Sequence, residues 1–318
     1  MNILFYCEGD DGQKMLDSLQ KALHDSSGQH IVHNAHSTKL SLDRTTIDAA
    51  VVWQPPVDFF NDLPALENVF ALAAGVDQLL LHPGLPHHVN IIRLEDAGMA
   101  TQMAEYVLYG ALCAQRNFYQ FQAAQRQSSW IHGLPVRSAR DTRVGILGTG
   151  VLGTAVASRL SLNNYPVSCW SRTPKSMGDG ITNVYGNDSL PCLLADSDVL
   201  VCLLPLTNDT QGILNKALFE QLPHGAFVIN CARGEHLNEA DLLHALETEH
   251  LAGAMLDVFS EEPLPEDHPF WHHPRILITP HEAARSLISE SVEQVINSIN
   301  QVERGRMPHG LVERSRGY

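Results

Sequence analysis

Three polar residues in the second half of the chain stand at turns that follow apolar runs. Arg233 lies in NCARG, Glu262 in VFSEEPLP and His281 in ITPHE, and the apolar run before each is typical of a strand. Open α/β sheets bind ligands at the carboxyl ends of their parallel strands, so we expect the three side chains to share a site. The plain alternatives are that Arg233 is a structural cation, that Glu262 is a solvated loop acid and that His281 is a core histidine.

These three residue types suit the reduction of a 2-keto acid by hydride transfer. Hydride attack places negative charge on the carbonyl oxygen, and Arg233 can hold the substrate carboxylate or stabilise that charge. The imidazole of His281 can donate the proton, because histidine side chains titrate near neutral pH. A carboxylate at Glu262 favours the imidazolium and orients the ring.

A glycine-rich turn follows another apolar run. It reads VGILGTGVLG from Val144 to Gly153, and a predicted helix comes after it. In a dinucleotide-binding turn, Gly148 permits the tight bend, Gly150 lets the backbone approach a pyrophosphate and Gly153 permits close helix–strand packing. The amides at the helix N-terminus then face the phosphates. The alternative is a packing turn. We predict dinucleotide contacts at Gly148, Gly150, Val151, Leu152 and Gly153.

The next predicted strand ends in CWSRTPK, without a carboxylate. An NAD site usually has Asp or Glu at this point, bound to the ribose hydroxyls. Arg172 can instead grip a 2′-phosphate through two parallel hydrogen bonds, and Lys175 adds a point charge. We therefore predict a preference for NADPH, with NADH weaker. The alternative is that both cations are solvated loop charges. The predicted contacts are Trp170, Ser171, Arg172, Thr173 and Lys175.

The elements that must position these residues form two alternating series, which predicts an α/β protein with parallel sheets. In the first hundred residues, strands are predicted at 3–6, 30–35, 49–53, 69–74 and 91–94, with a helix at 15–23. In the second series, strands are predicted at 144–147, 167–170, 199–203, 226–230, 253–256 and 276–278, with helices at 154–160 and 238–249.

Two longer helices are predicted to mark the division into lobes. One spans 100–127 and links the lobes, and the other spans 284–304 and returns to the first lobe. The predicted domains are 1–99 with 285–318 for the substrate and 100–284 for NAD(P), the second including the linking helix.

Composition excludes several classes of function. The chain has 318 residues and a formal net charge of −15, which argues against binding nucleic acid or an anionic membrane. No apolar run approaches the roughly 20 residues of a membrane helix, and the acidic N-terminus does not resemble a signal peptide. Six cysteines without a CxxC pair indicate a reducing compartment, predicted to be the cytoplasm. Seventeen histidines include no HExxH, and no metal is expected.

Nearly the whole chain resembles the D-isomer-specific 2-hydroxyacid dehydrogenases, and among them the glyoxylate/hydroxypyruvate reductases. The most specific stretch runs from NCARG through GAMLDVFSEEPLP to TPH, while RLEDAGM, WSRTPKS and the terminal RSRGY indicate the subgroup. The resemblance implies a flavodoxin-like substrate lobe, a Rossmann doubly wound nucleotide-binding lobe and an active site in the cleft. It also implies a homodimer through the helix near 100–127.

The same resemblance implies roles for individual residues. Arg233, Glu262 and His281 match the catalytic arginine, glutamate and acid/base histidine of the family. Asp257 matches a position that holds the nicotinamide carboxamide. The remaining implied contacts are Trp53, Ala74, Gly75, Val76 and Arg233 for the substrate, and Leu204, Pro205, Cys231, Ala232, Arg233 and His281 for the cofactor.

The function predicted from these observations is NADPH-preferring reduction of small 2-keto acids: glyoxylate to glycolate and hydroxypyruvate to D-glycerate. One alternative is a D-2-hydroxyacid dehydrogenase that acts on larger 2-keto acids. The alternative from another class is a non-catalytic, dinucleotide-sensing binding module, because a fold does not fix a function. Such a module is expected to add a peptide-binding surface or disordered tails.

Overall fold

The computed structural model describes residues 1–25, 30–37 and 42–317 and divides the chain into two units. The first unit is Met1–Gly98 with Ser286–Tyr318, and the second is Met99–Arg285. Tyr318, the last residue of RSRGY, and the segments 26–29 and 38–41 of the predicted substrate lobe lie outside the described residues. Among the described residues, no helix has the length and apolar character that crossing a membrane requires.

The first unit is built on a five-stranded parallel sheet in the order β2-β1-β3-β4-β5, the flavodoxin-like order. The strands are β1 (Asn2–Cys7), β2 (Ile31–Asn34), β3 (Ala49–Trp53), β4 (Asn68–Ala71) and β5 (Asn90–Ile92). Apart from Trp53, the residues of β3 and β4 are buried, as expected for the middle of a parallel sheet.

Helices from both ends of the chain belong to the first unit. Helix α1 (Gly12–Asp25) buries Met15, Leu16, Leu19 and Leu23 at helical spacing and packs against α9 (Ile288–Glu303). A four-residue helix, α2 (Asp77–Leu80), follows β4. Helix α9 belongs to this unit, and the start predicted for it at residue 284 was wrong. The cause is the extended backbone of Leu287, with φ −81° and ψ 138°.

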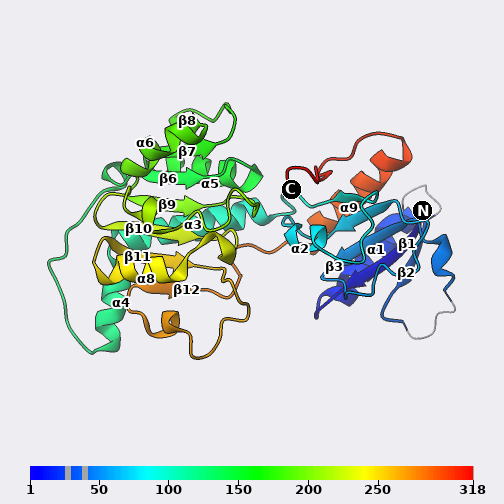
Figure 1. The fold of residues 1–318 in the computed structure, drawn as a ribbon, viewed down its shortest axis with the longest axis horizontal. Helices are drawn as coiled ribbons and strands as arrows, with labels where there is room; N and C mark the ends of the chain where they lie inside the picture. Colours follow the sequence, from blue (N-terminus) through cyan, green and yellow to red (C-terminus); the bar gives the residue numbers. More distant parts are fainter. Residues whose placement is uncertain (26–29, 38–41, 318) are drawn as a thin grey trace. The chain divides into compact units, whose positions relative to one another are not determined.

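The second unit is built on a seven-stranded sheet in the order β12-β11-β10-β9-β6-β7-β8 (Figure 1). Every neighbouring pair is parallel, so the predicted α/β class with a Rossmann sheet is confirmed. The strands are β6 (Val144–Leu147), β7 (Val167–Ser171), β8 (Ile181–Tyr185), β9 (Val199–Cys202), β10 (Ala226–Asn230), β11 (Leu251–Leu256) and β12 (Ile276–Ile278).

The helix predicted over residues 100–127 is two helices. Helix α3 (Met99–Gln115) and helix α4 (Phe118–Arg126) are separated at Asn117, whose φ of 56° is left-handed. Asparagine tolerates this conformation better than most residues, and its Nδ2 donates to the Pro135 carbonyl at 2.9 Å. Helix α3 packs against α5 (Val151–Leu162). The other helices of the unit are α6 (Leu190–Ala195), α7 (Lys216–Phe219) and α8 (Glu239–Glu247).

Strand β8 was missed by the sequence interpretation. Its residues, ITNVY, are half-buried or exposed, so the strand lacks the apolar run that marks the central strands. It occupies one edge of the seven-stranded sheet, where only β7 pairs with it.

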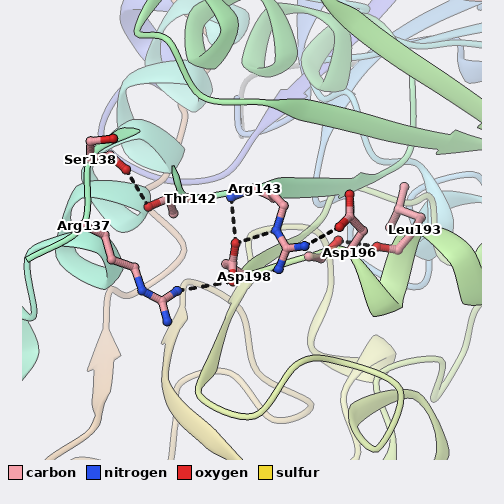
Figure 2. A network of polar contacts seen from close by, with 8 residues as sticks. Arg137, Ser138, Thr142, Arg143, Leu193, Asp196 and Asp198 are labelled. Atoms are coloured by element: carbon pink, nitrogen blue, oxygen red, sulfur yellow. Dashed lines mark hydrogen bonds and ion pairs between the residues drawn. The ribbon is translucent and has the colours of Figure 1, made fainter. Parts of the chain in front are cut away.

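An ionic network joins β6 and β9 at their amino ends (Figure 2). The Asp198 carboxylate accepts from the Arg143 backbone N–H and Nε, each at 2.9 Å, and from Arg137 at 3.2 Å. Arg143 also contacts Asp196. Burial alone raises the pKa of Asp198, but the hydrogen bonds from Arg143 and the nearby positive charges outweigh it and lower that pKa. The network at the amino ends of these strands therefore stabilises the fold. The candidate site lies at the opposite, carboxyl ends of the strands.

Candidate active site

The turn between β6 and α5 has the shape that a pyrophosphate requires. Gly148 has a left-handed φ of 107°, and a Cβ there would lie 2.7 Å from the Leu203 carbonyl oxygen. A Cβ on Gly153 would lie 2.2 Å from the Gly148 oxygen, so the helix packs closely on its own turn. A Cβ on Gly150 would meet no atom within 4 Å. The two crowded glycines thus shape the turn, and the open one leaves room for a ligand.

Helix α5 turns its first amides toward that open space. Gly150 is its N-cap residue, and no side chain caps the helix within the described residues. The first amides of a helix have no intrahelical acceptor, and the helix dipole adds partial positive charge. The amides of Val151, Leu152 and Gly153 are therefore suited to phosphate oxygens. The residues present fit a bound dinucleotide.

The cationic segment after β7 lies against the same turn. The Nζ of Lys175 donates to the Thr149 carbonyl oxygen at 2.6 Å, between two of the loop glycines. Arg172 and Thr173 are exposed, and the Ser171 hydroxyl donates to the Thr173 carbonyl at 2.8 Å. The segment therefore places positive charge beside the glycine turn.

Trp170 differs from its neighbours in this segment. Its side chain is buried, and its Nε1 donates to the Gly186 carbonyl oxygen at 2.8 Å. The indole thus belongs to the buried hydrophobic core of the second unit, and its predicted contact with the cofactor stays a prediction.

Four other predicted cofactor residues follow the neighbouring strands β9 and β10. Leu204 comes after β9, Cys231 and Ala232 come after β10, and all three are buried. Burial raises the pKa of the Cys231 thiol well above its usual range, so this cysteine is a neutral apolar group. The Pro205 carbonyl accepts from the Thr210 hydroxyl at 2.7 Å, which anchors the loop after β9.

His281 and Glu262 form a direct pair. Nδ1 of His281 lies 2.8 Å from one carboxylate oxygen of Glu262, and the other oxygen accepts from the Phe259 N–H at 2.9 Å. Both side chains are partly exposed. Since the carboxylate is an acceptor, Nδ1 carries the proton of that bond. In the described part of the chain, Nε2 of His281 has no hydrogen-bond partner, so it is the nitrogen able to exchange a proton with a ligand.

The backbone of His281 is held in a left-handed conformation, with a φ of 59°. For residues other than glycine, such a conformation costs on the order of 1–3 kcal/mol and persists where surrounding contacts impose it. The His281 N–H donates to the Asp257 carbonyl oxygen at 2.7 Å. The Asp257 carboxylate accepts from the N–H groups of Glu282 and Ala283 at 2.8 and 2.9 Å. Asp257, which is buried, therefore clamps the loop that carries His281.

A partly buried relay, missed by sequence reasoning, reaches this clamp from α3. The Thr279 hydroxyl lies 2.6 Å from an Asp257 carboxylate oxygen and 2.6 Å from the Tyr106 hydroxyl. Because Thr279 has one proton and must donate it to the carboxylate, Tyr106 is the donor to Thr279. Burial raises the pKa of Tyr106 above its usual range, so its hydroxyl stays protonated. Thr279 could have been found beside His281 in ITPHE, whereas no sequence signal indicates Tyr106.

Arg233 follows β10, and its loop packs against the loop of Glu262. A Cβ on Gly234 would lie 1.9 Å from the Phe259 carbonyl carbon, so the two backbones are in contact. One guanidinium nitrogen of Arg233 donates to the Ala232 carbonyl at 2.7 Å. Strands β10, β11 and β12 are neighbours. The structure therefore brings the loops of the three predicted catalytic residues together at the carboxyl ends of these strands.

His236 was also missed by sequence reasoning, and its ring contacts the loop that carries Arg233. Its fully buried ring lies 3.3 Å from the Pro205 carbonyl oxygen through Nε2 and 3.2 Å from the Arg233 backbone nitrogen through Nδ1. Burial lowers the pKa of His236, so the ring is neutral. Nδ1 also lies 3.1 Å from the Arg233 carbonyl oxygen, so this nitrogen faces both backbone polar groups of Arg233. The ring joins the loop after β9 to the loop after β10.

The predicted substrate contacts outside this sheet lie in the first unit. Trp53 ends β3 with 37% of its surface exposed, and Ala74, Gly75 and Val76 form the turn between β4 and α2. Gly75 is exposed and Val76 is buried. These residues share the carboxyl edge of the five-stranded sheet, the edge at which open α/β sheets bind ligands. Their role stays a prediction.

Comparison with known proteins identifies the family. The sequence model described as D-isomer specific 2-hydroxyacid dehydrogenase, NAD binding domain, matches residues 108–283. The chain is 44% identical to a glyoxylate/hydroxypyruvate reductase A of Yersinia enterocolitica, and the match covers all of both chains. The chain belongs to the D-isomer specific 2-hydroxyacid dehydrogenase family. The predicted resemblance is thereby confirmed.

Solved structures agree with this assignment. A D-isomer specific 2-hydroxyacid dehydrogenase of Xanthobacter autotrophicus, in complex with NADPH, is 38% identical with a TM-score of 0.91, covering 100% of this chain and 99% of that one. An NADPH-dependent glyoxylate/hydroxypyruvate reductase of Sinorhizobium meliloti, in complex with NADP, is 33% identical with a TM-score of 0.89 over the same shares. As a dehydrogenase of this family, the chain is an NAD(P)-dependent oxidoreductase. No group of three or more His, Cys, Asp or Glu residues suited to a metal occurs among the described residues.

Proposed function

We propose that this protein reduces small 2-keto acids with NADPH, converting glyoxylate to glycolate and hydroxypyruvate to D-glycerate. The observation that carries the proposal is the 2.8 Å pair of His281 and Glu262, which leaves the His281 Nε2 able to deliver a proton. The names of the full-length relatives and the NADPH and NADP complexes of similar structures support it.

The proposed mechanism assigns one task to each of three side chains. When bound at the glycine turn between β6 and α5, NADPH would supply the hydride for the carbonyl carbon. His281 donates the Nε2 proton to the carbonyl oxygen as the carbon–oxygen π bond breaks, which yields the 2-hydroxy acid. Glu262 stabilises the imidazolium before the transfer and fixes the ring through Nδ1. Arg233 holds the substrate carboxylate or the developing oxyanion.

The two units are proposed to divide the work as domains. The second unit, with its glycine turn, is proposed to bind the nucleotide and to carry the catalytic side chains. The first unit is proposed to contribute the backbone amides of Ala74, Gly75 and Val76 to the substrate carboxylate, with Trp53 near the substrate.

Selectivity for NADPH is proposed to come from the segment after β7. Ser171 ends the strand where a carboxylate would be needed for NAD, and Arg172 and Lys175 supply positive charge for a 2′-phosphate. The 2.6 Å contact of Lys175 with Thr149 supports this, because it brings the ammonium group to the turn that would hold the pyrophosphate.

A homodimer is proposed through α3 and α4. Tyr109, Leu112, Phe118 and Phe121 are large apolar side chains with more than a third of their surface exposed. Exposed apolar residues gathered on neighbouring elements mark interaction surfaces. Sedimentation analysis of the full chain tests this point: a mass near twice 35.1 kDa supports the dimer, and a monomer contradicts it.

The test of the function is NADPH oxidation by the purified protein with glyoxylate, hydroxypyruvate, pyruvate and phenylpyruvate in parallel, repeated with NADH. Fast turnover of the two small acids, with NADPH well ahead of NADH, is the expected result. Preference for phenylpyruvate would retain the mechanism and favour a dehydrogenase of larger acids. Tight NADPH binding without turnover would favour a dinucleotide sensor.

A further inference from the structure

The side chain of Asn183 on β8 holds both ends of the cationic segment. Its Oδ1 accepts from the Lys175 backbone N–H at 2.8 Å. Its Nδ2 donates to the Ser171 hydroxyl at 2.9 Å and to the Cys169 carbonyl oxygen at 3.2 Å. Asn183 and Cys169 are register partners across the β7–β8 pair, so one amide spans from the sheet to the end of the segment.

These contacts fix the geometry of residues 171–175. The Ser171 hydroxyl donates to the Thr173 carbonyl and accepts from Asn183, which uses its proton and one lone pair. At the other end, Lys175 is held by its backbone through Asn183 and by its ammonium group through Thr149. Asn183 thus contacts the backbone or side chain at both ends of the segment that carries the two cations.

Packing alone does not impose this shape. Residues 172–176 are exposed and contribute no side chain to the buried core. Ordering an exposed residue costs backbone conformational entropy, so a segment without buried side chains needs hydrogen bonds to hold one conformation. Asn183 itself is half-buried on an edge strand, where its loss need not disturb the centre of the sheet.

We propose that Asn183 is a positioning residue for cofactor selectivity, which orders Arg172 and Lys175 for the 2′-phosphate of NADPH by holding both ends of residues 171–175. The inference rests on the proposed preference for NADPH and extends it to a residue that touches neither phosphate nor ribose. Ordered cations bind an anion more tightly because less side-chain and loop entropy is lost on binding.

The test compares two nucleotides that differ by one phosphate. Binding of 2′,5′-ADP and of 5′-ADP to the full chain is measured by calorimetry for the wild type, Asn183→Ala and Thr182→Ala. Thr182 is exposed on the same strand and serves as the matched control. For Asn183→Ala we expect 2′,5′-ADP binding to weaken about tenfold, as re-ordering two cationic side chains implies, with 5′-ADP within twofold of wild type. Thr182→Ala should change neither.

The outcomes separate this inference from the function on which it rests. If Asn183→Ala keeps the wild-type ratio of the two affinities, or weakens both nucleotides equally, the positioning role is overturned and the NADPH preference stands. If the wild type itself does not discriminate the two nucleotides, the NADPH preference is contradicted and the inference falls with it. Asn183→Thr, which suits an edge strand and replaces the amide by a single hydroxyl, takes the place of Asn183→Ala if that variant does not fold, with the same expected direction.

Discussion

Replacing Glu262 by glutamine tests the proton-donating role of His281 while keeping the shape of the site. The glutamine carbonyl can still accept from the Phe259 N–H, which Glu262 binds at 2.9 Å. The amide group would then face Nδ1 of His281, where a carboxylate oxygen now lies at 2.8 Å. Since the amide donates hydrogen bonds, it favours a neutral ring with its proton on Nε2, and donation from that ring is unfavourable.

The magnitude follows from the lost charge. Two unit charges about 4 Å apart interact by about 4 kcal/mol at an effective dielectric constant near 20. The side chains of His281 and Glu262 are 48% and 36% exposed, so solvent screens the interaction. Screening reduces it to about 1 kcal/mol, or roughly fivefold in rate, and the loss of proton donation from a neutral ring raises the expected loss to about 100-fold in kcat.

The assay is steady-state reduction of glyoxylate with NADPH. We expect kcat to fall about 100-fold in Glu262→Gln with the KM for the keto acid within threefold, because the pair acts on proton donation and not on substrate binding. Glu261→Gln removes the same charge from the exposed neighbouring residue and should keep the wild-type kcat. A Glu262→Gln enzyme within threefold of the wild-type kcat would refute the role assigned to the pair.

Three further predictions follow from other parts of the second unit. Gly150→Val should weaken NADPH binding more than tenfold in calorimetry, because the side chain fills the open space before α5, and an unchanged affinity would contradict that site. Thr279→Val breaks the relay to Asp257 and should lower kcat about tenfold and stability by about 1–3 kcal/mol in urea unfolding; wild-type values would show that the relay is inert. Asp198→Asn should lower the free energy of unfolding by about 1–3 kcal/mol at pH 7. Because the pKa of Asp198 is lowered in the folded chain, this stability is present above the unfolded-state pKa of about 3.9 and is lost as pH falls further, so the gap to the wild type should close in acid. Asp196→Asn, at a 63% exposed side chain, should behave as wild type, and a constant gap at all pH values would contradict the ionic account.

The sequence was sufficient to predict the sheets and the edge at which the candidate residues lie. Apolar runs separated by helices predict parallel strands, and a parallel sheet collects the residues after its strands at one edge. For this reason His281 and Glu262, 19 residues apart, could be paired before their 2.8 Å contact was seen. The strand with little apolar content, β8, gave no comparable signal.

The supporting residues could not be predicted, since their roles depend on which polar atoms meet in three dimensions. Tyr106 lies on a helix 173 residues before Thr279, and its apolar neighbours indicate packing alone. The sequence shows His236 only as one of many histidines, whereas the structure shows a buried ring in contact with the backbones of Arg233 and Pro205. Likewise, Asn117 looks like an ordinary helical residue until its left-handed backbone divides the helix predicted there.

Polar groups at the two ends of the seven-stranded sheet are used in opposite ways. At the amino ends, Arg143 and Asp198 satisfy each other, and their hydrogen bonds stabilise the fold. At the carboxyl ends, the buried carboxylate of Asp257 accepts hydrogen bonds from backbone N–H groups. These bonds help to hold His281 in a backbone conformation that is unfavourable by itself. That arrangement leaves Nε2 of His281 without a hydrogen-bond partner in the described part of the chain. A residue that must act on a ligand needs its other bonds supplied by neighbours, which explains why the residues that the sequence did not reveal are the ones that surround the histidine and the arginine.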